Sequence, residues 1–302
     1  MDNYIYISSR RKKEKYINDN FSNSIFIKSN PSKSKLNSLL EVIKASDAKT
    51  IILEDYFIGI NEFIEELNKL KLIIKFVWTN GLGTLNEEIE LGNLQYVIEL
   101  LNNKKIKEVY FTEENTYLAF KSLKGVHRLL LTVKDNNEEV CYDGNSVGIL
   151  GDTYDWRSNN YNQISAIKLL DGYRVNGFKI KRLFKKFTKL FNIELKNYKC
   201  LGELINNSNI ISCIEFSPLF TFEIMESFNK GVPCIVGNNI SIFKNTDLEK
   251  LVVVKSDDSI NEIAEKLKNG IKNKKKIIKL YKKIKKEYDL ESAKSINKLI
   301  GG

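Results

Sequence analysis

Short apolar runs alternate with longer amphipathic stretches along almost the whole chain, and this alternation constrains the fold more than any other feature. The runs are rich in β-branched and aromatic residues, which is typical of buried strands. Strand–helix alternation indicates parallel sheets with helices on both faces, so we predict an α/β protein. The predicted strands are Tyr4–Ser8, Ser24–Lys28, Thr50–Leu53, Ile73–Trp78, Glu108–Phe111, Arg128–Val133, Val147–Leu150, Tyr173–Val175, Glu194–Tyr198, Ile210–Glu215, Pro233–Gly237 and Leu251–Val254.

The stretches between these runs carry apolar residues at helical spacing. The predicted helices are Lys35–Ala45, Ile60–Leu70, Glu87–Leu101, Thr116–Leu123, Phe222–Asn229 and a long tail over Ser259–Leu299.

The pattern is interrupted once, at residues 134–146, where the sequence KDNNEEVCYDGNS is polar and rich in turn residues. A chain of 302 residues is long enough for two domains of ordinary size. We therefore predict an N-terminal domain over residues 1–140 and a C-terminal domain over residues 141–302, each a doubly wound, Rossmann-like sheet. Ligands of such sheets bind at the carboxyl ends of the strands, so we expect the two domains to face a cleft that holds the site.

The segment from Cys213 to Ile240 predicts a binding site. It reads as a buried strand, a loop, a short helix and a second buried strand. A loop that follows a parallel strand and opens a helix presents backbone N–H groups, which suit phosphates and sugar hydroxyls. Glu226 lies on that helix, where a carboxylate can accept hydrogen bonds from the two hydroxyls of a ribose. The alternative is an ordinary βαβ unit of the core with a capping glutamate.

The run from Glu226 to Pro233, followed by CIVG, resembles the E-A-M-A-C-G-V-P-V-I-V segment of family 4 glycosyltransferases, which have the GT-B fold. The resemblance implies that Glu226 holds the nucleotide ribose and that the loop Ser217–Phe222 faces the hexose and phosphate, with Ser217, Thr221 and Phe222 as donor-binding residues. It also implies retention at the anomeric carbon and no obligate metal. Pro218 stands where the family has the first glutamate of its E-x7-E motif.

A second stretch, Val147–Phe178, resembles the opening of the GT-B C-terminal domain, where a basic residue in the first loop meets the diphosphate. Arg157 is the candidate here, with Asn159 and Asn160 as neutral donors. Arginine suits this role because its guanidinium donates two hydrogen bonds at once to phosphate oxygens. The alternative is a surface arginine beside Trp156.

Two acidic residues end an N-terminal strand. Glu54 and Asp55 follow Thr50–Leu53, at the edge of the sheet where a site would lie. Either could act as a base toward an acceptor hydroxyl and is our candidate catalytic group. The alternative is an acid at a helix N-terminus or a solvated loop pair. His127, the one histidine, is interpreted as a hydrogen-bonded residue at a strand edge.

The chain carries a formal charge of +10, from 48 Lys and Arg against 38 Asp and Glu. Lysine supplies most of the excess, whereas proteins that read phosphates favour arginine, so the charge indicates polyanions or an anionic membrane surface only in general terms. The stretch Phe178–Phe191 is basic and amphipathic. It is interpreted either as an ordinary surface helix or as a contact with an anionic membrane or polyanionic acceptor.

The four cysteines are scattered and no metal-ligand spacing occurs, so we expect no metal and no cofactor besides the donor. The N-terminus lacks an apolar targeting segment, and no run is long enough to span a bilayer. We expect a cytoplasmic protein that can contact the membrane surface.

These features together predict a glycosyltransferase that moves a hexose from a nucleotide-sugar to a glycan, protein or lipid acceptor. Pro218 motivates a second interpretation, a degenerate GT-B protein that binds without transfer. The net charge motivates a third, a nucleic-acid binder or a phage-type DNA glycosyltransferase.

Overall fold

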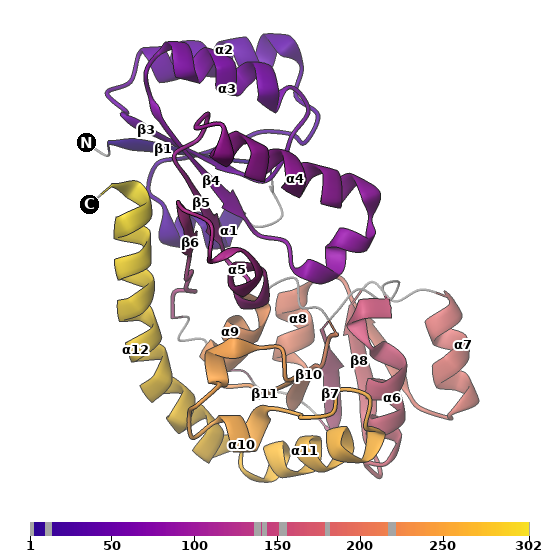
Figure 1. The fold of residues 1–302 in the computed structure, drawn as a ribbon. Coiled ribbons are helices and arrows are strands. Elements are labelled where there is room, and N and C mark those ends of the chain that lie inside the picture. Colours follow the sequence, from indigo (N-terminus) through magenta and orange to yellow (C-terminus); the bar gives the residue numbers. More distant parts are fainter. Residues whose placement is uncertain are drawn as a thin grey trace. The chain divides into compact units, whose positions relative to one another are not determined.

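The computed structural model describes residues 3–9, 14–135, 140, 144–150, 156–178, 182–216 and 222–301, without the side chains at 156, 178 and 182–184 (Figure 1). The chain forms two compact units. The first comprises Met1–Val133 together with Asp289–Gly302, and the second comprises Lys134–Tyr288. The first unit thus ends before the predicted boundary at residue 140, and the end of the chain belongs to it rather than to the second unit.

The first unit is built on a parallel sheet of six strands in the order β2-β1-β3-β4-β5-β6. The strand order reverses between β1 and β3, which is the topological switch point of this unit. β1 and β3 are buried along their whole length, as expected of strands covered by helices on both faces. The strands are β1 (Tyr4–Ser8), β2 (Ser24–Phe26), β3 (Thr50–Glu54), β4 (Ile73–Trp78), β5 (Glu108–Phe111) and β6 (Val126–Arg128).

Local sequence explains where several helices of this unit begin. Ser32 caps α2 by accepting from the backbone N–H of Lys35, and Glu113 caps α5 in the same way with Asn115 and Thr116. The helices of this unit are α1 (Glu14–Asn20), α2 (Lys33–Lys44), α3 (Ile60–Lys69), the 3₁₀ turn η2 (Leu82–Asn86), α4 (Glu88–Asn102) and α5 (Glu114–Phe120).

The second unit has a five-stranded parallel sheet in the order β11-β10-β7-β8-β9. This is the order of a Rossmann sheet, and its switch point lies between β7 and β10. Val253 adds one parallel bridge to Val236 outside β11. The strands are β7 (Ser146–Ile149), β8 (Arg174–Phe178), β9 (Leu195–Tyr198), β10 (Ile210–Cys213) and β11 (Cys234–Val236).

Helices follow the strands of the second unit in regular alternation. They are the 3₁₀ turn η3 (Trp156–Ser158), α6 (Asn160–Lys168), α7 (Arg182–Leu190), α8 (Leu201–Asn206), α9 (Phe222–Asn229), the 3₁₀ turn η4 (Ser241–Phe243), α10 (Glu249–Val252) and α11 (Ile260–Lys272).

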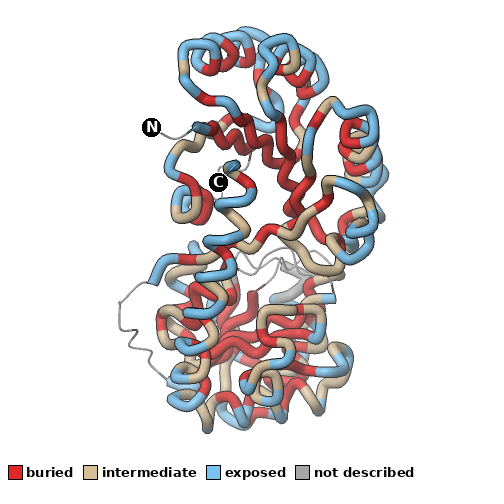
Figure 2. The backbone as a smooth tube through the Cα atoms, turned by 60° about the vertical axis from the view of Figure 1, so that its left-hand side comes forward, coloured by how far each residue is buried: buried red, intermediate tan, exposed pale blue. Residues whose placement is uncertain are grey.

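Each unit has its own hydrophobic core, and Figure 2 shows the buried residues concentrated along the strands of each sheet. In the second unit, side chains pack so closely against β7 that position 148 has no room for a side chain. A Cβ atom on Gly148 would lie 2.5 Å from Cδ1 of Ile211 and 2.7 Å from Oγ of Ser208. It would also lie 3.0 Å from Cδ2 of Leu204 on α8, so the close approach of α8 and β10 to β7 depends on the missing side chain.

The last helix, α12 (Lys274–Ile300), begins in the second unit and ends in the first. In the first unit its final turn meets a polar cluster on the sheet. Lys75 Nζ donates to the carbonyl of Lys298 at 3.1 Å and pairs with Glu108 at 3.0 Å. The hydroxyl of Tyr110 donates to the same carboxylate at 2.9 Å. A cation at a helix C-terminus complements the helix dipole, so this cluster holds the end of α12.

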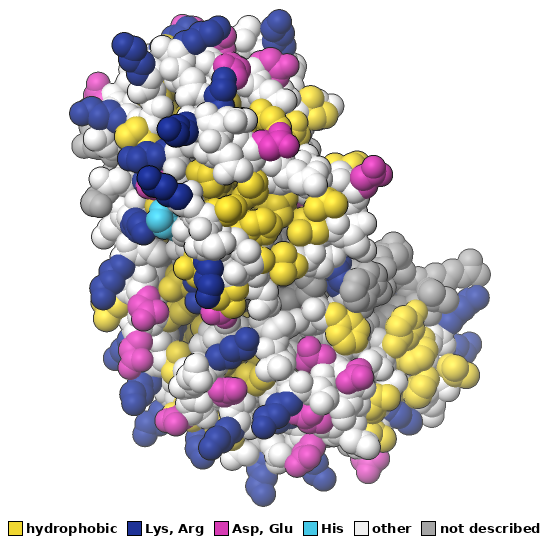
Figure 3. All heavy atoms as spheres, viewed as in Figure 1, with side chains coloured by type: hydrophobic (Ala, Val, Ile, Leu, Met, Phe, Trp, Pro, Cys, Tyr) yellow, Lys and Arg dark blue, Asp and Glu magenta, His cyan; other side chains and the backbone are white. Residues whose placement is uncertain are grey.

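His127 borders this cluster, and Figure 3 shows its ring on the surface beside lysine side chains. Its Nδ1 and the Nζ of Lys298 are 3.1 Å apart. Partial burial, reinforced by the charge of Lys298, lowers the pKa of His127, because both disfavour the imidazolium. Burial works to raise the pKa of Glu108, but the hydrogen bonds from Lys75 and Tyr110 outweigh it and hold that pKa below its usual range. The prediction of a hydrogen-bonded strand-edge histidine is confirmed.

The predicted elements agree with the structure except at a few places. The run Arg128–Val133 is mostly not a strand: β6 ends at Arg128, the N–H of Leu129 donates once more to the carbonyl of Phe111, and residues beyond it bond to side chains. The N–H of Leu130 donates to Ser295 on α12, and Asn20 Oδ1 accepts from the N–H of Thr132. The predicted strand Leu251–Val254 is a helical turn followed by a single bridge, and the predicted tail divides into α11 and α12 at Asn273.

Candidate functional site

The carboxyl edge of the second sheet carries the candidate site, because the loops that follow β7 and β10 meet there. The N–H of Phe216, just beyond β10, donates to the carbonyl of Arg157 at 2.7 Å. Arg157 lies in η3, which follows β7, and its side chain is half-buried. The structure thus places Arg157 at the switch point, where ligands of doubly wound sheets bind.

The side chain of Gln163 connects the loop after β7 to the residues at the end of β10. Its Nε2 donates to the carbonyl of Ser158 at 2.7 Å, and its Oε1 accepts from the hydroxyl of Ser212 at 2.6 Å and from the N–H of Ile214 at 3.3 Å. The side chain is fully buried in α6. One amide therefore ties η3 to the end of β10, and the geometry of the edge depends on it.

A third loop joins this edge after Val254. The amide of Asn159 donates to the carbonyl of Asp257, and the N–H of Asn238 donates to the Asp257 carboxylate at 3.1 Å. Asn239 donates to the carbonyl of Glu215. Burial raises the pKa of Asp257, and Glu262 and Asp258 add to this effect against the hydrogen bond from Asn238. Sequence reasoning missed Asp257; the signal that could have found it is its place three residues after the apolar run Leu251–Val254.

The predicted neutral donors toward phosphate, Asn159 and Asn160, are both buried. The side chain of Asn159 donates to Asp257 and accepts from Nδ2 of Asn162 at 2.8 Å. Asn159 also has a positive φ of 50°, which asparagine tolerates better than most residues. Its amide therefore serves to join loops.

Glu226 lies in the middle of α9 and is 8 % exposed. Phe222, one turn earlier on the same face, begins α9 and is also buried, and Lys230, one turn later, is buried with its Nζ bonded to Asn206 at 2.9 Å. The helix bounds agree with the predicted Phe222–Asn229. Ser217, Pro218 and Thr221 lie outside the described residues. The ribose role of Glu226 stays a prediction.

Glu54 and Asp55 stand at the carboxyl end of β3, beside the switch point of the first unit. They are 2 % and 5 % exposed, so the alternative of a solvated loop pair is wrong. Both carboxylate oxygens of Asp55 accept from the hydroxyl of Thr79, at 3.0 and 3.2 Å. Asp55 also has a positive φ of 59°. Their role as a catalytic base stays a prediction, as does the cleft between the two domains.

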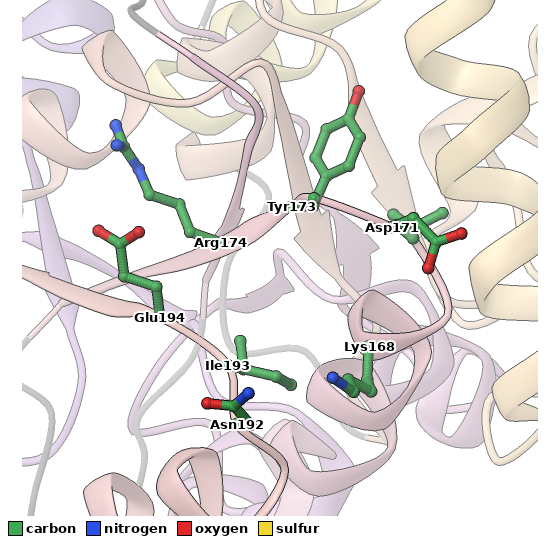
Figure 4. A pocket seen from close by; sticks show the side chains of 9 residues that line it. Lys168, Asp171, Tyr173, Arg174, Asn192, Ile193 and Glu194 are labelled. Carbon is green, nitrogen blue, oxygen red and sulfur yellow. The ribbon is translucent and has the colours of Figure 1, made fainter.

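One pocket of the second unit lies at the opposite, amino edge of the sheet. Figure 4 shows it between the end of α6, the start of β8 and the segment before β9. Basic and acidic side chains line it, among them Lys168 and Arg174 against Asp171 and Glu194. Of the residues proposed for donor binding, those that the structure describes, Arg157, Phe222 and Glu226, do not line this pocket. In the described part of the chain, no helix is both long and apolar enough to cross a membrane.

No protein-family model and no curated protein matches the sequence. Solved structures do match. TarM from S. aureus superposes with a TM-score of 0.67 at 15 % identity, over 88 % of this chain and 58 % of that one. HepE from Anabaena superposes with a TM-score of 0.64 at 11 % identity, over 99 % and 98 % of the two chains. A trehalose-phosphate synthase from Burkholderia xenovorans gives 0.65 at 9 % identity, over 89 % and 77 %.

These three proteins are glycosyltransferases of the GT-B fold. This chain spans less than two thirds of the length of TarM. At such low identities the superpositions establish architecture. Two parallel, Rossmann-like sheets and the matches to these structures confirm the predicted fold class: the chain has the GT-B fold.

Proposed function

We propose that this protein is a glycosyltransferase that moves a hexose from a uridine diphosphate sugar to a glycan, protein or lipid acceptor. The observation that carries the proposal is the junction of the loops after β7 and β10 at the switch point, with Arg157 in one loop and Phe216 in the other. Two neighbours support the choice of nucleotide, since TarM and HepE were solved with UDP. The trehalose-phosphate synthase is described as UDP-forming.

In this proposal the second unit holds the donor. Arg157 offsets the charge of the diphosphate as it leaves, which is the main electrostatic task of such a transfer. Glu226 accepts hydrogen bonds from the ribose hydroxyls, and residues Ser217, Thr221 and Phe222 face the sugar and phosphate. We propose that protein donors suffice, without an obligate metal, and that the anomeric configuration is retained. Asp55 or Glu54 would serve as the base on the acceptor side.

The test of the ribose contact pairs a protein change with a ligand change. Glu226→Ala should weaken UDP binding by about 1–3 kcal/mol for each charge-assisted hydrogen bond lost. The same variant should leave the affinity for 2′,3′-dideoxy-UDP unchanged, because that ligand lacks the hydroxyls. Glu223→Ala, on the same helix, is the matched control. Equal losses for both ligands in calorimetry would mean that Glu226 only supports the helix, for example as a counter-charge to Lys230.

Arg157 is tested through the phosphates. Arg157→Ala should weaken UDP but not uridine, because only UDP carries the diphosphate. Arg174→Ala, at the amino edge of the same sheet, should weaken neither ligand. A loss of the same size for UDP and uridine would remove Arg157 from the phosphate site.

Pro218 favours a second candidate function, a GT-B protein that binds nucleotide without transfer. It replaces the glutamate expected at that position of the motif. A panel of UDP-, GDP- and TDP-sugars separates the two candidates. Release of the corresponding nucleoside diphosphate from any of these donors supports transfer. Tight UDP binding without turnover, in wild type and in Pro218→Glu alike, supports binding alone.

A further inference from the structure

The chain has two strongly basic stretches, one around α7 and one that runs from the end of α11 into α12. Residues 178–199 contain eight Lys and Arg and one Glu, a net charge of +7, and residues 272–286 contain nine Lys and no acidic residue. α7 connects β8 to β9, and β9 is the outermost strand of its sheet. Lys185, Lys186 and Lys189 are all exposed. These three lysines therefore lie at one edge of the second unit, away from the switch point between β7 and β10.

Apolar side chains are exposed among these lysines. Leu190, at the end of α7, is 81 % exposed, and Leu169, at the end of α6, is 55 % exposed. Tyr161 on α6 is 46 % exposed, and its ring lies 4.7 Å from that of Phe187 on α7. Phe187 in turn contacts Phe191 at 4.6 Å. The contact between Tyr161 and Phe187 packs α6 against α7. The exposed side chains of Leu169 and Leu190 therefore lie on two helices that contact each other.

The ends of α6 and α7 approach each other. The pocket at the amino edge is lined by residues that follow α6 and by residues that follow α7 (Figure 4). Leu169 and Leu190 directly precede these two segments. Figure 3 shows hydrophobic side chains gathered on this part of the second unit, with basic and acidic side chains around them. We call this surface the α6–α7 face; it comprises Tyr161, Lys168, Leu169, Lys185, Lys186, Lys189 and Leu190.

We propose that the α6–α7 face docks on the surface of an anionic lipid bilayer. Lysines favour a negatively charged surface, and apolar side chains between them gain free energy only where they leave water. Nucleic acid would satisfy the lysines but would leave Leu169 and Leu190 facing phosphates or water. Lysine-rich composition with one arginine in residues 178–199 also suits a diffuse anionic surface better than fixed phosphates.

The experiment measures co-sedimentation of the full chain with vesicles of phosphatidylcholine containing 30 mol % phosphatidylglycerol, at low salt. The wild type should bind these vesicles and not pure phosphatidylcholine. Replacing Lys185, Lys186 and Lys189 together by glutamine should weaken the partition by about a hundredfold, since each lysine contributes roughly 1 kcal/mol near such a surface. Leu190→Ser should weaken it about tenfold without changing the charge.

Matched controls come from elsewhere in the chain. Lys275, Lys276 and Lys279 on α12 are exposed and have the same spacing, so their replacement by glutamine should reduce binding much less. Ile89 on α4 is 77 % exposed, and Ile89→Ser should have no effect. All replaced residues are exposed, and thermal melting verifies that the variants fold.

Three results would overturn the proposal. One is the absence of binding to the anionic vesicles. Another is an equal loss of binding in the α12 and α7 triple variants, which would indicate net charge alone. The third is a duplex oligonucleotide that binds more tightly than the vesicles and is insensitive to Leu190→Ser, which would indicate a nucleic-acid surface.

Discussion

Replacing Lys75 by methionine should loosen the end of α12 from the first sheet. Lys75 and Glu108 face each other in register on β4 and β5, and their side chains are 5 % and 18 % exposed. Removing one partner of a buried ion pair costs about 3–5 kcal/mol, because the other charge stays behind without compensation. Glu108 keeps some water and its bond from Tyr110, so we expect a loss near the lower limit, about 3 kcal/mol.

A second variant separates the charge effect from the packing effect. Lys75→Met with Glu108→Leu removes both charges and should cost only about 1 kcal/mol, because Tyr110 and the carbonyl of Lys298 each lose a partner. The double variant should therefore be about 2 kcal/mol more stable than Lys75→Met alone.

The assay is urea unfolding followed by the fluorescence of Trp78, which is buried in the first unit, in a Trp156→Phe background. Hydrogen exchange at the last turn of α12 gives a local readout, and it should accelerate in Lys75→Met. A double variant that is as unstable as Lys75→Met would refute the reasoning, as would a single variant that loses less than about 1 kcal/mol.

Three further predictions concern single residues. The lowered pKa of His127 means that the unfolded chain takes up its proton first, so the free energy of unfolding should fall as pH drops below about 6.5. Urea unfolding at pH 7.5 and 5.5 should show a smaller fall in His127→Gln. Gly148→Ala should cost about 1–3 kcal/mol, because its Cβ would overlap Ile211 and Ser208; an unchanged melting temperature would contradict this. Gln163→Leu should weaken UDP binding with little change in the bounds of α6, and unaltered affinity in calorimetry would show that the loops hold without it.

Much of the fold follows from local pattern. The strands Tyr4–Ser8, Ile73–Trp78 and Glu108–Phe111 and the helix Phe222–Asn229 have the predicted bounds, because buried strands and amphipathic helices leave a periodic record in the sequence. Arg128–Val133 has the same apolar pattern, yet most of it is not a strand. Its backbone groups bond to Asn20 and Ser295, which are distant in sequence, and no local pattern reveals such partners.

For the candidate site, too, the sequence predicts some features and the tertiary structure decides others. The sequence places Arg157 after one strand and Glu226 on the helix after another, which suffices to predict a donor loop and its helix. It does not show that Glu54 and Asp55 are buried, nor that Asp257 joins the edge through Asn159. Burial of a carboxylate depends on which strands become neighbours, and strand order is a property of the whole sheet.

The sequence by itself therefore determined the α/β class, the positions of most strands and helices, and the presence of two Rossmann-like halves. Only the tertiary structure decided the order of the strands and the return of residues 289–302 to the first unit. It also decided how α6 and α7 combine to form one basic, apolar face. The physical reason is the sequence separation of the interacting residues. Hydrophobic periodicity reflects neighbours within a few residues, whereas hydrogen bonds such as that between Lys75 and Lys298 join residues more than 200 positions apart.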